Sequence, residues 1–233
     1  APSPRWATCD GDLPVEMWTR LLAGTKTRLS PCVEILCRPY PAAKSKPTSV
    51  EIARGLAAEY LSMGADSVYL FNYFDMARLD GAEKNHPLRK ENYRPLLNTL
   101  GAEETVLRTE RRHMLTYPDA GPIWRRKFAA LPLKLPENGE GQFLRLRTGK
   151  IPEGMRVEIS IGVRGAAPEA LTAFANSRPL TFVREERIVP AYTDGPVYVF
   201  APENTSFSGP FLIVEIHASA PAEIDYLDAR VFE

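Results

Sequence analysis

The sequence carries no net charge, and it has no long apolar run. Its 233 residues contain 29 Lys and Arg against 29 Asp and Glu, so the formal charge is zero at pH 7. A chain without a positive excess has no general attraction for a polyanion, so we expect no nucleic-acid partner. Because no stretch of about 18 consecutive apolar residues occurs, we expect no membrane span either.

Cysteine and histidine are scarce, with three of each. Cys32 and Cys37 fall in one predicted strand and face opposite ways, so we expect free thiols rather than a disulfide between them. The three histidines are scattered over different segments, which argues against a metal site. Phosphate-binding glycine loops, dinucleotide fingerprints and the HExxH and GxSxG motifs are all missing. We therefore expect no metal and no other cofactor.

A helix and a strand are clearly marked between Pro47 and Asp75, in the sequence PTSVEIARGLAAEYLSMGADSVYLFNYFD. Thr48 and Glu51 have the spacing of a capping box and predict the start of the helix. Apolar residues recur at helical spacing up to Gly64, which stands where a left-handed residue ends many helices. The run VYLFNYF that follows is typical of a parallel strand covered on both faces.

The first half of the chain continues this alternation of strands and helices. The pattern predicts strands at 5–10 (RWATCD) and 32–37 (CVEILC), and helices at 13–22 (LPVEMWTRLL) and 87–100. Strands and helices that alternate in this way predict parallel strands joined by helical crossovers. We expect this α/β part to occupy residues 1–120.

The period of the hydrophobic pattern changes near residue 120. Short alternating strands separated by turn residues follow, among them QFLRLRT, RVEISIGV and FLIVEIHA. About seven such strands predict an antiparallel β-sandwich or jelly roll. We assign it to residues 121–233, with the boundary in residues 115–127.

Two stretches resemble a known family. LLAGTKTRLSPCVEILCRPYP, followed by EIARGLAAEYLSMGADSVYLFNYFD, resembles the closing helices and strands of TIM-barrel proteins related to glycoside hydrolases. The resemblance implies the last βα units of a (β/α) barrel followed by a β-sandwich domain, with an oligo- or polysaccharide as substrate. A full barrel has eight βα units and this chain shows about three, so the resemblance implies a site that is incomplete for catalysis in this chain alone.

A partial barrel leads to expectations about partners and origin. Its open sheet edges and apolar face predict that residues 1–120 associate with another copy or with an N-terminal barrel half. The chain begins with Ala1 rather than Met. We therefore expect a processed chain or a fragment of a longer one, and an extracellular or periplasmic location is favoured.

Candidate site residues follow from the rule that α/β barrels carry their sites at the carboxyl ends of the strands. Glu34 and Asp75 are the predicted catalytic residues, because glycoside hydrolysis uses two carboxyl groups on either side of the scissile bond. Residues at the same strand ends that can bind hydroxyl groups or stack on a sugar ring are the predicted substrate contacts: Asp10, Arg38, Tyr40, Asn72 and Tyr73.

Structural roles compete with these assignments. Glu34 is equally well explained as a buried charge paired with Arg38, two residues from the end of its strand. Asp75 can simply open the loop after its strand, and Asp12 fits a helix N-cap better than a catalytic role.

Two functions of other classes stay open at this point. The β-sandwich can be a non-catalytic carbohydrate-binding or structural module, and the barrel-like part can be only an association surface. Four aromatic residues are candidates for a sugar platform on the sandwich, although core packing is the commoner fate of such residues: Trp124, Tyr192, Tyr198 and Phe207.

Overall fold

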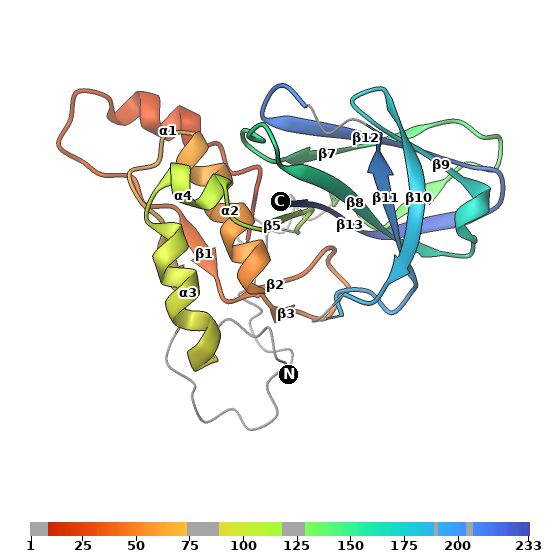
Figure 1. Ribbon diagram of the computed structural model, residues 1–233, viewed down its shortest axis with the longest axis horizontal. Helices are drawn as coiled ribbons and strands as arrows, with labels where there is room; N and C mark the ends of the chain where they lie inside the picture. Colours follow the sequence, from red (N-terminus) through yellow and green to blue (C-terminus); the bar gives the residue numbers. More distant parts are fainter. Residues whose placement is uncertain (1–8, 74–88, 118–128, 189–190, 204–206) are drawn as a thin grey trace.

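The computed structural model describes residues 9–73, 89–117, 129–188, 191–203 and 207–233. The predicted residues 5–8, Asp75 and Trp124 lie outside these ranges. Figure 1 shows the four α-helices on one side of the molecule and a large antiparallel sheet on the other, with α2 and β5 where the two parts meet. No helix in the described residues is long and apolar enough to cross a membrane.

The large sheet has nine strands and is nearly closed. Its strands follow the order β5-β13-β8-β11-β10-β9-β12-β7, β6 pairs with β13, and the two end strands β5 and β7 approach each other. The strands are β5 (Arg111–Met114), β6 (Leu133–Leu135), β7 (Gln142–Arg147), β8 (Arg156–Arg164), β9 (Leu171–Ala175), β10 (Arg178–Glu186), β11 (Val197–Pro202), β12 (Phe211–Ala218) and β13 (Ala222–Phe232).

Alternation of side chains explains how these strands close around one core. On β12, Leu212, Val214 and Ile216 are fully buried, whereas Ile213 between them is 38% exposed. Successive side chains of a strand point to opposite faces, so a period of two gives one apolar face per strand. The buried faces meet in a core that runs from Leu131 to Val231. The predicted antiparallel, sandwich-like second half agrees with this architecture.

Apart from a 3-10 turn at Pro168–Ala170, the remaining elements lie in the first half of the chain, and all but the helices α2 and α3 are short. They are α1 (Val15–Leu22), β1 (Cys32–Glu34), β2 (Leu36–Cys37), β3 (Lys46–Pro47), α2 (Val50–Ser62), β4 (Tyr69–Phe71), α3 (Lys90–Leu100) and α4 (Glu103–Leu107). β1 and β4 form a parallel pair, and β2 and β3 form an antiparallel pair.

The expected series of (β/α)-barrel units is wrong. The described residues contain a single parallel pair, and the molecule is predominantly an antiparallel β-structure with four α-helices. The predicted strand 32–37 breaks at Ile35, because Leu36 and Cys37 leave the parallel pair to join β3. The resemblance to TIM-barrel glycoside hydrolases therefore does not extend to the fold.

Helix α2 occurs where the sequence predicts it, but a different residue caps it. The Ser49 side chain accepts a hydrogen bond from the Ile52 N–H at 3.2 Å, whereas the Thr48 hydroxyl donates to the main-chain oxygen of Glu34 at 2.8 Å. At the other end, Gly64 has φ +90°, and the N–H groups of Gly64 and Ala65 donate to Leu61 and Tyr60. This is a Schellman ending, as the position of Gly64 predicts.

The helical part and the large sheet share a core. Ile188, Tyr192, Val197 and Tyr226 of the β-rich half belong to the same apolar cluster as the buried residues of α2. β5, from the range assigned to the α/β part, pairs along its whole length with β13. This joint core fixes α2, and the strands beside it, relative to the sheet.

Candidate functional site

Glu34 and Asn72 are the predicted site residues that the structure brings together. The Asn72 side-chain amide donates to the Glu34 carboxyl at 3.1 Å. Asn72 follows β4 and has φ +63°, a left-handed conformation that costs free energy in residues other than glycine. Such conformations cluster at functional sites, and here the turn brings the amide to the end of the neighbouring strand.

Glu34 is buried, with 1% of its surface exposed. Its carboxyl accepts a hydrogen bond from the Ile35 N–H at 3.0 Å. Burial raises the pKa of this carboxyl, and the hydrogen bonds from Asn72 and from the main chain oppose that rise in part. A raised pKa is what a proton donor at neutral pH requires. The predicted pairing of Glu34 with Arg38 is not among its hydrogen bonds or ion pairs in the described residues.

The other predicted substrate contacts lie in different surroundings. Arg38 donates to the carbonyl of Pro41 and lies over the ring of Tyr117, with 5.4 Å from its guanidinium carbon to the ring centre. The Tyr40 hydroxyl accepts a hydrogen bond at 2.7 Å from Arg164, on β8. Through these contacts the two residues connect the β2–β3 region to neighbouring segments.

Tyr73 and Asp10 are held by the interior. Tyr73 is 6% exposed, its hydroxyl has no hydrogen-bond partner in the described residues, and burial raises its pKa well above the usual value. Asp10 accepts a hydrogen bond from the Asp12 N–H at 3.0 Å, and burial raises the pKa of its carboxyl. Asp12 does not cap α1, because the helix begins at Val15 and Pro14 is at its N-cap; the Asp12 carboxylate pairs with Arg145 at 2.9 Å.

Two exposed aromatic rings lie on the same face of the parallel pair as Glu34. The register pairs Cys32 with Tyr69 and Glu34 with Phe71, so these four side chains share one face, here called the β1–β4 face. Tyr69 is 55% exposed and Phe71 37%, and their ring centres are 6.2 Å apart. The opposite face carries Val33, which is fully buried in the core with α2.

The prediction of a strand covered on both faces is thus wrong for β4. The strand has only three residues, and two of them carry rings that are only partly covered, Tyr69 with 55% and Phe71 with 37% of its surface exposed. Sequence reasoning missed Tyr69 and Phe71 as surface residues because their hydrophobicity indicated burial. The usable signal was their spacing of two, which puts both rings on one side of an extended chain.

A second group of polar residues surrounds a cavity of about 340 Å³ between the start of α2 and the large sheet. Ser49, Glu51 and Ile52 of the helix line one side. The other side is lined by residues of β5, β10, β13 and the adjoining segments: Glu110, Arg112, Arg184, Glu186, Arg187, Ile188, Tyr192 and Arg230. We call this cavity the arginine pocket. Of these residues only Tyr192 was a sequence candidate, as part of a sugar platform; the charged residues were not predicted as site residues.

The three cysteines contribute little chemistry to the β1–β4 face or to the arginine pocket. Cys9 and Cys37 are fully buried, and all three thiols are free. Cys9 donates to the main-chain oxygen of Glu34 at 3.4 Å, and burial raises the pKa of Cys37 to about 11. Thiols held neutral in this way are poor nucleophiles. In the described ranges, no cluster of three or more His, Cys, Asp or Glu residues could hold a metal ion.

No protein-family model matches this sequence, and no curated protein matches it significantly. What the chain does must therefore be argued from its sites.

The β1–β4 face combines two exposed aromatic rings, tilted by 48° to each other, with a polar edge. Tyr69 and Phe71 present ring surface to solvent, and the carboxyl of Glu34 and the amide of Asn72 lie at the adjoining strand ends. The causes of the raised pKa of Glu34 include no second carboxylate of the described chain. The face can therefore bind a ligand with an apolar side and hydroxyl groups. The amide of Asn72 is partly exposed beside the rings, whereas the carboxyl of Glu34, which it binds, is buried.

The sandwich aromatics do not form a comparable surface. Tyr192, Tyr198 and Phe207 are 4%, 7% and 8% exposed, so they pack in the interior. The rings that are exposed on the strands of the large sheet, Phe143 and Phe182, belong to β7 and β10, which lie at the edge and near the middle of the strand order.

Proposed function

We propose that this protein binds an oligosaccharide on the β1–β4 face. The observation that carries the proposal is the pair of exposed rings, Tyr69 and Phe71, on the face that also holds the carboxyl group of Glu34. Sugar rings present C–H surfaces that stack on aromatic rings, while their hydroxyl groups need donors and acceptors nearby. Both requirements are met within two adjacent strands.

The exposure of the two rings supports a binding role for them. Burial of apolar surface stabilises a protein by roughly 25 cal/mol per Å². Two large aromatic side chains that stay exposed on one short strand are therefore typical of an interface or a ligand site. Tyr69 and Phe71 contact each other and leave much of their surface to solvent. A ligand that covered them would recover part of that apolar burial.

Calorimetry with a panel of neutral oligosaccharides tests the proposal. The wild-type chain should bind at least one of them, and Tyr69→Ala or Phe71→Ala should weaken that binding on the order of tenfold, the loss of one ring contact. Phe71→Trp, which keeps an aromatic surface, should retain binding. Leu97→Ala is the matched control, because Leu97 is 47% exposed on α3 and does not belong to the face.

Two results would refute the proposal. One is the absence of binding to every glycan in the panel. The other is binding that is unchanged in both ring variants, since the ligand would then contact a different surface.

Glycoside hydrolysis is a second candidate function, favoured by the carboxyl group of Glu34, whose pKa burial raises. Hydrolysis requires a second carboxyl group as a nucleophile or base. In this reading Glu34 is the proton donor, and the partner carboxyl comes from outside the described residues. Glu34→Gln should abolish release of reducing sugar from a bound glycan without abolishing binding. If the wild type binds glycans but releases no sugar from any of them, binding alone is the function.

A further inference from the structure

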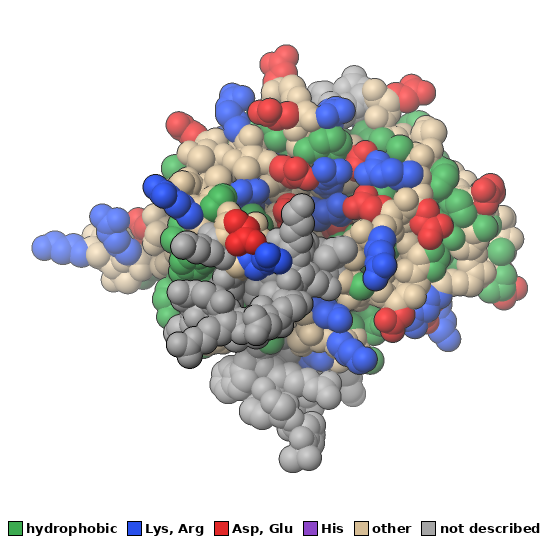
Figure 2. All heavy atoms as spheres, turned by 60° about the horizontal axis from the view of Figure 1, so that its bottom comes forward, with side chains coloured by type: hydrophobic (Ala, Val, Ile, Leu, Met, Phe, Trp, Pro, Cys, Tyr) green, Lys and Arg blue, Asp and Glu red, His purple; other side chains and the backbone are tan. Residues whose placement is uncertain are grey.

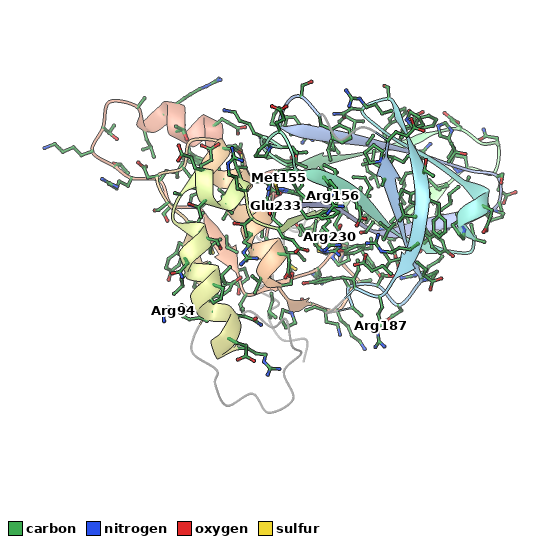
Figure 3. The ribbon with its side chains drawn as sticks, viewed as in Figure 1. Arg94, Met155, Arg156, Arg187, Arg230 and Glu233 are labelled. Atoms are coloured by element: carbon green, nitrogen blue, oxygen red, sulfur yellow. The ribbon has the colours of Figure 1, made fainter. Side chains whose placement is uncertain are left out.

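The arginine pocket shares no residue with the β1–β4 face. It lies where the first turn of α2 meets β5, β10 and β13. Figure 3 shows Arg230 on β13 in the middle of the molecule and Arg187 beyond the end of β10, toward the rim. Its volume of about 340 Å³ lies within the range of small-molecule sites, roughly 300–1,000 Å³.

Three of its arginines are held in place by carboxylates. Arg112 contacts Asp228 at 2.8 Å and Glu186 at 2.6 Å. Arg184 contacts Glu186 at 2.9 Å and forms a two-pronged pair with Glu158 at 2.7 and 2.8 Å. Because each guanidinium is fixed by its carboxylate partners, it loses little freedom when a ligand binds.

Arg230 completes this network. It contacts Glu110 at 2.6 and 2.8 Å and approaches Glu158 at 3.5 Å. Asp228 is fully buried and neither it nor Glu158 lines the cavity. The carboxylates that anchor the arginines therefore lie partly behind them, and guanidinium groups form much of the wall.

Arg187 differs from the other three arginines. It lines the pocket and is exposed, yet it has no hydrogen bond or ion pair with any described residue. It also borders an adjoining cavity of about 500 Å³, which shares Glu186, Ile188 and Tyr192 with the first. A guanidinium group offers several N–H donors in a plane, and it matches the two oxygens of an oxyanion.

The hydrogen-bond donors and acceptors that line the pocket indicate which kind of ligand it can bind. Glu186 and Glu110 already accept from the neighbouring arginines, whereas the guanidinium groups have N–H donors left over. Glu51, on the α2 side of the pocket, is the lining carboxylate that forms no hydrogen bond or ion pair with an arginine of the described residues, so a cationic ligand would find one free carboxylate among these donors. A ligand with anionic oxygens would satisfy them.

We propose that the arginine pocket binds a small molecule through an oxyanion, a carboxylate or a phosphate, which pairs with Arg187. The network as a whole is close to neutral, because four arginines, with Arg187 included, lie among the four carboxylates of Glu110, Glu158, Glu186 and Asp228. Positive and negative side chains are also interleaved on the face of the molecule that Figure 2 shows. Recognition thus depends on hydrogen bonds at short range and not on a broad positive field.

Heteronuclear NMR titrations of the full chain with three probes test this inference. Inorganic phosphate and glucuronate, each raised to about 10 mM so that a Kd near 1 mM can be measured, represent the two sources of oxyanion. Glucose is the neutral counterpart of glucuronate. We expect shifts around Arg187 and Tyr192 with at least one anion and none with glucose, and the anion that binds identifies the source.

Matched variants make the result specific. Arg187→Ala should weaken anion binding on the order of tenfold, the usual size of one charge-assisted pair, and Arg187→Lys should recover part of it. Arg94 is an exposed arginine of α3 far from the pocket (Figure 3), so Arg94→Ala removes the same charge and should leave binding unchanged.

Three outcomes would overturn the inference. They are the absence of shifts with both anions, equal binding of glucose and glucuronate, and equal loss of binding in the Arg187 and Arg94 alanine variants. None of them affects the proposal for the β1–β4 face, because the rings tested there do not line this pocket.

Discussion

Gly55, in the middle of α2, lies directly against the main-chain carbonyl group of Arg112 on β5. A Cβ atom placed on Gly55 would come within 2.0 Å of that oxygen and 2.7 Å of the carbonyl carbon. No real contact is so short, and main-chain atoms cannot swing aside as a flexible side chain does. The helix can pack on the sheet at this distance only because residue 55 has no side chain.

Gly55→Ala should therefore destabilise the protein, although alanine is the better helix former. The expected loss in the free energy of unfolding is about 1–3 kcal/mol, the usual cost of overpacking, and it outweighs the gain of nearly 1 kcal/mol in helix propensity. Urea denaturation measures it. Gly101→Ala is the control, because a Cβ there meets nothing within 4 Å. Equal midpoints for the two variants would contradict this packing.

The buried ion pair between Arg112 and Asp228 gives a second prediction. Asp228 is fully buried, and its carboxylate also accepts a hydrogen bond from the Tyr226 hydroxyl. Asp228→Asn should destabilise the fold by up to about 3 kcal/mol, because the largely buried guanidinium group of Arg112 would lose one of its two carboxylate partners and keep only Glu186.

Thermal or urea unfolding of the Asp228 variant should be compared with that of Glu91→Gln. Glu91 pairs with Arg89 at 2.7 Å, but its side chain is 57% exposed, so its loss should leave the midpoint unchanged. If both variants unfold at the wild-type midpoint, the Arg112 network contributes nothing to stability.

The parts of the fold that the sequence predicts correctly are those with local signals. Helix α2 has a periodic apolar face and Gly64 at its end, and strands such as β12 alternate over eight residues. Each of these patterns repeats often enough to outweigh chance. The strands β1 and β4 have three residues each, which is too short for a period to distinguish a covered strand from an exposed one.

The N-cap of α2 is a case in which a tertiary contact outweighs a local sequence signal. Thr48 and Glu51 have ideal spacing for a capping box, yet Ser49 caps the helix. The hydroxyl of Thr48 is used instead to bind the carbonyl of Glu34, which is 14 positions earlier in the chain. Only the fold reveals that competing partner.

The two candidate sites also differ in how far the sequence could predict them. Glu34 and Asn72 could be predicted because both follow from the rule of strand ends in parallel pairs, and the structure does hydrogen-bond them. The arginine pocket could not be predicted, because Arg112 lies 74 positions from Glu186 and 116 from Asp228. No pattern in a single sequence joins residues so far apart.

The pKa values of the two histidines in the described residues should be shifted in opposite directions. His113 is buried, and its Nε2 accepts a hydrogen bond from Arg111 at 3.0 Å, so its Nδ1 carries the proton that Glu59 accepts at 2.7 Å. Burial, together with the Arg111 charge, lowers the pKa of His113 well below 6.5. His217 donates to the carbonyl of Gly139 and contacts Glu215, and these contacts raise its pKa above 6.5.

An NMR titration of the imidazole signals from pH 8 to pH 5 checks this contrast. We expect the His217 signals to shift with a midpoint above 6.5 and the His113 signals to stay at the neutral position throughout. A His217→Gln variant assigns the moving signal. A His113 signal that titrates near 6.5 would show that Arg111 does not hold this ring neutral.

Glu34 provides the last prediction, on the dependence of stability on pH. Burial raises the pKa of its carboxyl above the ordinary value of 4.5, so the folded state keeps a proton that the unfolded state releases. Linkage then requires the wild type to lose stability as pH rises from 4.5 to the folded pKa, and to lose no more beyond it.

Glu34→Gln is neutral at every pH and can still accept from the Ile35 N–H. The two proteins should therefore have similar stability at pH 4, and the variant should be the more stable at pH 8. Urea midpoints at half-unit steps measure the difference, and subtracting the two curves removes the contributions of Asp10 and Glu59, the other described acids whose pKa burial raises. A difference that is constant between pH 4 and pH 8 would mean that Glu34 ionises in the folded protein as readily as in the unfolded chain, and it could not then serve as a proton donor on the β1–β4 face.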